Sequence, residues 1–401
     1  MAANNGKHSH LILVLVSYVS FIALGMPSGL LSVAWPSMRT TFRLPIDAVG
    51  LLMGAVMAGS LVSAFVSGPL AARIGIGRLL VLNTAVAVLG LLGYALVPTW
   101  WMIIACGLLV GISAGMVDSV LNVVFAALGS SRLMGWLHAF YGAGAMLGPL
   151  VMTGILEAGH SWRWGYAGAG LLQAALLACF ALTSRWWDTP DSLQVQDGDQ
   201  PAMASVGRTL RLPALWLSLA LFLLAAGVES SAGQWPYSMF TEARAVAPVT
   251  AGLWTSVYWA ALTVGRVLTG LVGDRFSITA TLRGSLVAVT IGALLVWWRG
   301  SDLASFLGLA MMGIALAPIY PLLQLITPRR LGAEHAANAI GFQTAVGYLG
   351  VGILPGLAGV LAKGISLEII GPFLLVGALA MSIAHETVVR REPRGADSPA
   401  N

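Results

Sequence analysis

The chain has 401 residues, of which 58% are hydrophobic and only 9% are charged. With a mean hydropathy of +0.85, this composition excludes a soluble globular protein and predicts a polytopic membrane protein. The formal net charge is +5, but the basic residues are scattered one or two to a loop, so we expect no nucleic-acid partner.

Several classes of chemistry are also disfavoured. Cys106 and Cys179 are the two cysteines, both within apolar stretches, so we expect neither a disulfide framework nor a metal site, and no cofactor. The phosphate-binding pattern GxxxxGK[ST] does not occur, which argues against an ATP-driven pump. Since no motif indicates covalent chemistry, we do not expect an enzyme.

Twelve apolar segments are long enough to span a bilayer, which takes about 20 residues each. The first follows Lys7 and is longer than the apolar core of a signal peptide, so we expect it to be retained. The segments cover residues 11–34, 47–70, 78–97, 101–128, 133–157, 162–183, 213–240, 249–272, 279–298, 302–326, 337–362 and 366–388. The predicted fold is therefore all-α and integral to the membrane, with twelve transmembrane helices.

One polar stretch, residues 184–211, divides the segments into two sets of six. It is rich in Asp, Gln, Ser and Pro and has no apolar periodicity, as is typical of a linker. We therefore expect an N-terminal six-helix bundle over 1–183, a linker over 184–211 and a C-terminal six-helix bundle over 212–401.

Basic residues indicate how the chain is oriented. Of the 21 Lys and Arg residues, six lie in odd-numbered loops, Arg266 lies within a span, and the other fourteen lie at the termini and in even-numbered loops. The positive-inside rule then places both termini and the linker in the cytoplasm. We expect a multi-pass protein of the inner (plasma) membrane, surrounded by lipid and monomeric.

The two halves also resemble each other in sequence. A shift of 202 residues superposes Gly50, Gly68 and Gly111 on Gly252, Gly270 and Gly313, and a shift of 206 superposes Pro149 on Pro355. The order and register of these matches indicate two pseudo-symmetric bundles of common ancestry. Such a repeat places a substrate site near the bilayer midplane.

Asp118 is the leading functional candidate, because an ionised carboxylate in hydrocarbon costs about 2.5–3.5 kcal/mol on insertion scales. Helical periodicity puts Gly107, Gly111, Gly115, Asp118 and Asn122 on one face, with His138 on the next helix. The alternative is a structural Asp that bonds a neighbouring helix, with the glycines serving as packing contacts.

Two loops resemble the cytoplasmic motif of the major facilitator superfamily. They read GPLAARIGIGR at 68–78 and GLVGDRF at 270–276, and the first has Ala72 where the family usually has Asp. The resemblance covers essentially the whole chain and implies gating roles, in which charged groups close the cytoplasmic side, for Arg73, Arg78, Asp274 and Arg275. Arg266 lies about a turn inside the membrane from Asp274, and we expect it to belong to the gate rather than to contact substrate. Arg266 is expected to snorkel to the membrane edge or to pair with Asp274.

Three stretches resemble the fucose permease-like, sugar:proton symporter branch of that superfamily: GMVDSVLN at 115–122, GWLHAFYGAGAMLGP at 135–149, and GVESSAGQWPYSMF at 227–240 with GIALAPIYP at 313–321. The family's acid followed four residues later by Asn matches Asp118 and Asn122. Its embedded acid on the first helix is absent, because residues 11–35 contain none.

Glu229 is the second candidate for proton coupling; its alternative position is at the interface, where the helix breaks toward Pro236. Asp47, Glu157, Glu242, Asp302 and Glu368 lie at span ends and are expected to be solvated.

Amides and aromatic rings are the groups that bind sugars. The candidate substrate ligands are Asn122, His138, Tyr141, Gln234, Trp235, Tyr258, Trp259, Tyr320, Gln324 and Gln343. We expect the four amides to converge on one cavity with Asp118.

Together these features predict a secondary active transporter for a small polar solute, a sugar, working by alternating access with proton coupling. The alternative is a proton-coupled drug or metabolite antiporter, which the spacing of Gly135, Gly144 and Gly148-Pro149 also fits. A third class, a sensor built on a transporter body, would be expected to carry a long soluble extension.

Overall fold

The computed structural model describes residues 2–127, 131–187, 204–272 and 277–391. These residues are helical nearly throughout and form two compact units, Met1–Asp197 and Gly198–Asn401. The observed helices coincide with all twelve predicted spans. The all-α fold with two six-helix bundles is therefore confirmed.

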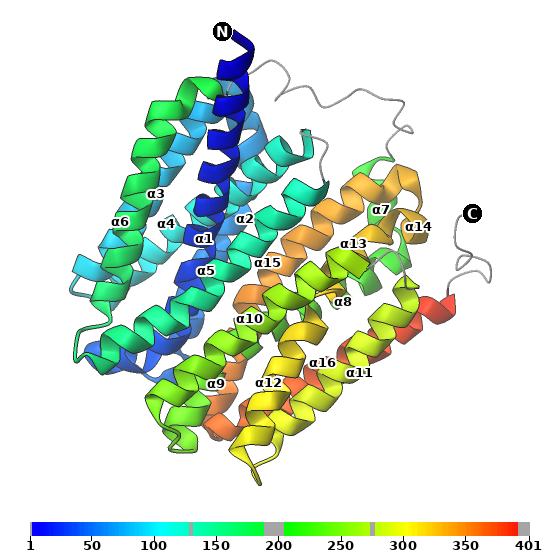
Figure 1. Ribbon diagram of the computed structural model, residues 1–401. Coiled ribbons are helices and arrows are strands. Elements are labelled where there is room, and N and C mark those ends of the chain that lie inside the picture. The colour runs from blue at the N-terminus through cyan, green and yellow to red at the C-terminus, as the bar shows by residue number, and fades with distance from the viewer. Residues whose placement is uncertain (1, 128–130, 188–203, 273–276, 392–401) are drawn as a thin grey trace. The chain divides into compact units, whose positions relative to one another are not determined.

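Unit 1 contains six long helices (Figure 1). They are α1 (Ala2–Phe42), α2 (Val49–Ile74), α3 (Ile76–Leu96), α4 (Trp100–Ala127), α5 (Ser131–Glu157) and α6 (Arg163–Thr183), with short turns η1 (Ile46–Ala48) and η2 (Ser184–Trp186). Within the unit, α1 packs on α5, α2 on α4, and α3 on α6.

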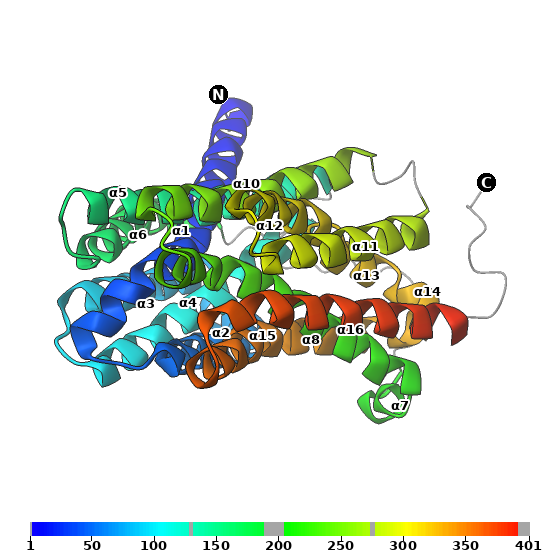
Figure 2. The ribbon, with the colours of Figure 1, turned by 90° about the horizontal axis from the view of Figure 1, so that it is seen from below.

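Unit 2 repeats this arrangement with more interruptions. Its elements are α7 (Val206–Leu210), α8 (Pro213–Gln234), α9 (Pro236–Ser238), η4 (Met239–Ala243), α10 (Pro248–Val272), α11 (Ile278–Trp297), α12 (Asp302–Leu316), α13 (Ile319–Leu325), α14 (Thr327–Leu331), α15 (Ala333–Gly364), η6 (Leu367–Ile369) and α16 (Ile370–Arg391). Here α8 packs on α15, α10 on α12, and α11 on α16 (Figure 2). In both units the first span therefore pairs with the fifth, the second with the fourth and the third with the sixth.

Two predicted spans of unit 2 are broken in the structure. The seventh changes from α8 to α9 at Pro236, and the tenth changes from α12 to α13 at Pro318. A proline inside a helix removes one backbone N–H and clashes with the carbonyl four residues earlier. Proline alone does not decide the break, because the prolines inside α1, α2, α5 and α15 leave those helices continuous.

Within the described residues, eleven helical stretches are long and apolar enough to cross a membrane. The helix α10 is not among them, although its 25 residues reach across a bilayer. It carries Trp254, Tyr258, Trp259 and Arg266, which lower its hydropathy. Three of these residues, Tyr258, Trp259 and Arg266, belong to the candidate site.

Candidate functional site

Asp118 and Asn122 lie one turn apart on α4 and are joined by hydrogen bonds. The Asn122 Nδ2 donates to Asp118 Oδ1 at 2.9 Å and to the Asp118 backbone carbonyl at 2.8 Å. The acid and the amide therefore share one face, as the spacing predicts. Both side chains are half-buried.

His138 on α5 extends this pair into a chain of three groups. Its Nε2 lies 3.1 Å from Asn122 Oδ1. Since the Asn122 Nδ2 faces two oxygens that accept, it must be the NH₂ end of the amide, and Oδ1 must be the acceptor end. The His138 Nε2 therefore carries a hydrogen and donates it to Asn122. The ring of Phe21 from α1 makes a T-shaped contact with this imidazole, at 5.7 Å between ring centroids.

Close helix packing holds these residues in place. A Cβ on Gly111 would collide with the Val56 carbonyl oxygen on α2, and one on Gly144 would collide with that of Ile22 on α1. Glycine is needed at both positions because the helix backbones touch there. The glycines are thus packing contacts, and the polar chain lies on the helices that they position. Tyr141, one turn beyond His138, packs against the apolar core of unit 1.

Unit 2 places the second acid in an ion pair. Arg266 Nη2 on α10 lies 2.9 Å from Glu229 Oε1 on α8, and the side chains are 24% and 19% exposed. The Tyr258 hydroxyl donates to the Glu229 backbone carbonyl at 2.7 Å. The sequence offers Asp274 as a partner of Arg266; Asp274 and Arg275 lie outside the described residues.

Other candidate ligands of unit 2 are engaged in helix packing. Gln343 is fully buried and its Nε2 donates to Ser218 Oγ and to Thr327 Oγ1, both at 2.9 Å. The Trp235 Nε1 donates to the Pro355 carbonyl at 2.9 Å. In this conformation both side chains join helices.

Two further candidate ligands, Gln324 and Tyr320, make fewer or weaker contacts with neighbouring helices. The Gln324 Nε2 donates to Thr344 Oγ1 over 3.4 Å, a long bond, and the side chain is half-buried. The ring of Tyr320 meets Phe222 edge-on at 4.8 Å. Roles of all these residues as substrate ligands stay predictions, and so does the convergence of the amides on one cavity.

The predicted gating arginines of unit 1 are exposed. Arg73 lies at the end of α2 and Arg78 at the start of α3. Arg78 also lines a cavity of about 300 Å³ with Arg185, Ile74 and Ser184. Gly75 separates the two helices with a φ of +84°, a backbone conformation that favours glycine.

One expectation about span ends is wrong. The sequence predicts a solvated Glu368, but its side chain is only 11% exposed and accepts two bonds from Arg244, at 2.8 and 2.9 Å. Arg244 also donates to Ser305 Oγ and to the Val296 carbonyl. The sequence carries no signal for this cluster, because Arg244 follows η4 and its partners lie on α11, α12 and η6.

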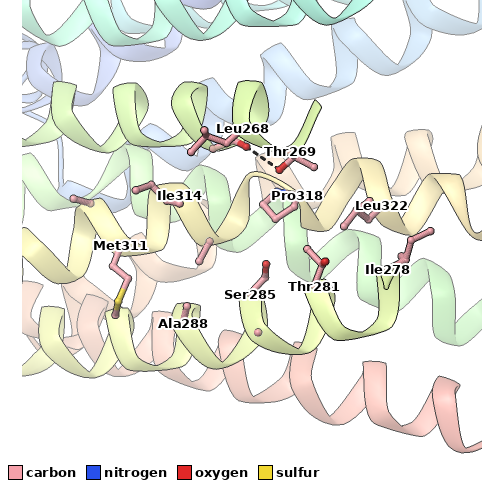
Figure 3. Close-up of a pocket in the computed structure, with 14 residues that line it drawn as sticks. Leu268, Thr269, Ile278, Thr281, Ser285, Ala288, Met311, Ile314, Pro318 and Leu322 are labelled. Atoms are coloured by element: carbon pink, nitrogen blue, oxygen red, sulfur yellow. Dashed lines mark hydrogen bonds between the residues drawn. The ribbon is translucent and has the colours of Figure 1, made fainter. Parts of the chain in front are cut away.

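A cavity of unit 2 lies among α10, α11, α12 and α13 (Figure 3). It has a volume of about 570 Å³ and is lined mainly by small and apolar side chains, including Leu268, Ala288, Met311, Ile314 and Leu322. None of the predicted ligands lines it. Its chemistry suits hydrocarbon rather than a polar solute.

Comparison with known proteins decides the family. The family model of the Major Facilitator Superfamily matches residues 17–241 and 217–400, which together span nearly the whole chain. The chain belongs to the major facilitator superfamily. It is therefore a multi-pass membrane transporter, and its relatives are transporters rather than enzymes.

Relatives within the superfamily are distant. Bypass of stop codon protein 6 of Saccharomyces cerevisiae is 24% identical over 392 residues, covering 89% of this chain and 78% of that protein. A D-xylose transporter of Levilactobacillus brevis is 28% identical over 166 residues, covering 39% of this chain and 35% of that protein.

Solved structures of the same fold agree with this assignment. A bacterial homologue of the human lysosomal transporter Spinster, in an inward-facing and unoccupied conformation, has a TM-score of 0.77 at 15% identity and covers 98% of this chain and 99% of that one. A point mutant of the nucleoside transporter NupG has a TM-score of 0.75 at 13% identity, with 94% and 99% covered. At these identities the likeness shows the fold.

Proposed function

We propose that this superfamily member transports a small polar solute, a sugar, together with protons across the inner membrane by alternating access. The observation that carries the proposal is the hydrogen-bonded chain of Asp118, Asn122 and His138 inside membrane-spanning helices. Polar groups at such depth are costly and are found mostly where substrates or ions pass.

Asp118 is the group that would carry the proton. While it is ionised, its bond from Asn122 is charge-assisted, which is roughly twice as strong as a neutral bond. Protonation would weaken that bond and loosen the link through Asn122 to His138 on α5. Because α5 packs on α1 through Gly144, a change of protonation at Asp118 would affect the positions of both α5 and α1.

Glu229 would be the second proton group. Its ion pair with Arg266 joins α8 to α10, and a proton on Glu229 would remove the charge that holds Arg266 there. Each acid then links two helices in its own unit, which is an arrangement suited to coupling protonation to helix movement.

The gate on the cytoplasmic side would use Arg73 and Arg78 from unit 1 and Asp274, with Arg266 or Arg275, from unit 2. Ala72 leaves the unit 1 copy of the motif without its acid, so the lock would be one-sided. The positive-inside distribution supports cytoplasmic termini and a cytoplasmic linker over residues 184–211.

The sugar class is supported by the polar inventory and by the D-xylose transporter among the relatives. The antiporter alternative relies on glycine spacing in α5, and two of those glycines have a packing reason. A Cβ on Gly144 or on Gly148 would collide with the backbone of α1, at Ile22 and at Met26 and Leu30 respectively. Packing therefore accounts for Gly144 and Gly148 without a drug-export function, whereas an added Cβ on Gly135 meets nothing within 4 Å.

The test is uptake into proteoliposomes containing the purified full chain. Radiolabelled monosaccharides, beginning with D-xylose, and cationic dyes are supplied with and without an imposed pH gradient. We expect accumulation of at least one sugar that collapses when a protonophore dissipates the gradient. Gradient-driven movement of dyes and of no sugar would reject the proposal.

A further inference from the structure

Four buried polar atoms of α8, α9 and α10 have no hydrogen-bond partner among the described residues. They are Gln234 Nε2, Ser238 Oγ, Ser256 Oγ and Trp259 Nε1, and their residues are at most 6% exposed. Leaving such a group unsatisfied costs about 1–3 kcal/mol. Each such group calls for an explanation, and a ligand that binds there is one of them.

The four groups lie on neighbouring helical segments, α8–α9 on one side and α10 on the other. Gln234 and Ser238 are one turn apart on the α8–α9 side, and Ser256 and Trp259 are one turn apart on α10. Helix α9 packs on α10. The indole of Trp259 lies on the α8 backbone at Gly233, where an added Cβ would collide with the ring at Cζ2. Gly233 therefore makes room for the ring next to Gln234.

The two serines behave differently from their neighbours. The hydroxyl of Ser231 donates to the Gly227 carbonyl at 2.7 Å, and that of Thr255 donates to the Ala251 carbonyl at 2.8 Å. Both are fully buried and are satisfied within their own helix turns. Ser238 and Ser256 lie close to them in the chain yet do not form this bond. Their hydroxyls are thus available to another group.

The chemistry of the four atoms selects the kind of ligand. An indole N–H and an amide NH₂ can only donate, while a hydroxyl can donate or accept. All four atoms can donate a hydrogen bond, and none of them can only accept one. They therefore suit a molecule whose acceptor oxygens lie close together. It does not suit a metal cation, which needs oxygen ligands and is repelled by N–H donors.

We propose that Gln234, Ser238, Ser256 and Trp259 form a donor site for adjacent oxygens of the transported solute, with Ser238 and Ser256 as its specificity-determining residues. This inference rests on the proposed function for the identity of the solute as a sugar. It adds Ser238 and Ser256, which are not among the ligands predicted from the sequence. It also makes the unit 2 contribution to recognition rich in hydrogen-bond donors, with Trp259 offering both an N–H and a ring face.

The test measures binding of D-xylose to the detergent-purified full chain by isothermal titration calorimetry. The variants are Gln234→Leu, Ser238→Ala, Ser256→Ala and Trp259→Phe. Each removes one donor, and we expect each to weaken binding about fivefold, as for the loss of about 1 kcal/mol. The matched controls Ser231→Ala and Thr255→Val remove hydroxyls that are satisfied within the helix and are expected to leave the Kd unchanged.

Thermal unfolding of the ligand-free variants provides the second readout. Removing an unsatisfied buried donor is expected to leave the Tm unchanged or to raise it, whereas the control substitutions remove real hydrogen bonds and lower it. Weaker binding without loss of stability distinguishes a ligand site from a structural one. Weaker binding with a Tm lowered as in the controls would overturn the site.

The outcomes separate this inference from the proposed function. If the wild type accumulates D-xylose under a pH gradient and all four variants bind it as tightly, the donor site alone is overturned. If binding is weakened as expected but no gradient drives uptake, proton coupling fails and the site stands. If a panel of pentoses, hexoses and nucleosides shows no binding to the wild type, both are overturned.

Discussion

Gly313 on α12 lies against the backbone carbonyl of Tyr258 on α10, where a Cβ would be 2.5 Å from the oxygen. In unit 1, Gly111 on α4 lies against the carbonyl of Val56 on α2 in the same way. Each member of one pair is separated from its counterpart by 202 residues, which is the shift seen in the sequence. The repeat is thus preserved at the level of a single helix crossing.

Substitution of these glycines should be costly. We expect Gly111→Val and Gly313→Val each to destabilise the protein by about 1–3 kcal/mol, because the backbones must separate to admit the side chain. Thermal unfolding in detergent measures the change. Gly54→Ala on α2 is the control, since nothing lies within 4 Å of its added Cβ; an equal loss there would contradict the packing explanation.

Asp118→Asn should separate coupling from binding. The variant keeps the size of the side chain and can still accept the bond from Asn122, but it cannot titrate. We expect gradient-driven accumulation to be abolished while counterflow exchange stays largely intact, as measured in proteoliposomes. If the variant still accumulated substrate, the coupling proton would have to be carried by Glu229 or another group. If exchange were also lost, Asp118 would be primarily a substrate ligand.

The stability contributed by the Glu229–Arg266 ion pair should require both residues. Removing either charge leaves the other half-buried without its salt-bridge partner, so Glu229→Gln and Arg266→Gln are each expected to cost about 1–3 kcal/mol, between exposed and fully buried pairs. The double variant should recover much of that stability without recovering coupled uptake. A double variant whose loss equals the sum of the single losses would show that the pair has no mutual stabilisation.

Arg244 should be important for stability rather than for transport coupling. Its guanidinium is 7% exposed and bonds Glu368, Ser305 and the Val296 carbonyl. We expect Arg244→Met to cost about 3–5 kcal/mol, because it leaves a buried carboxylate with reduced compensation. Arg283→Met is the control: its pair with Glu386 is 51% and 37% exposed, so at most about 1 kcal/mol should be lost. Comparable losses of Tm in the two variants would contradict the role of burial.

The sequence by itself determined the twelve spans, their division into two related bundles and the shared face of Asp118 and Asn122. These properties are local or periodic. Apolar length decides whether a segment spans the bilayer, and helical geometry brings residues four apart together whatever surrounds the helix.

Only the tertiary structure decided which residues from different helices meet. The contact of His138 with Asn122, the pairing of Arg266 with Glu229, and the burial of Glu368 under Arg244 each join elements whose register is set by close packing at glycines and by neighbouring side chains. Partners 124 residues apart, such as Arg244 and Glu368, leave no trace in helical periodicity. The unsatisfied hydroxyls of Ser238 and Ser256 could not be predicted either. The sequence around a serine does not show whether its hydroxyl bonds a carbonyl of its own helix.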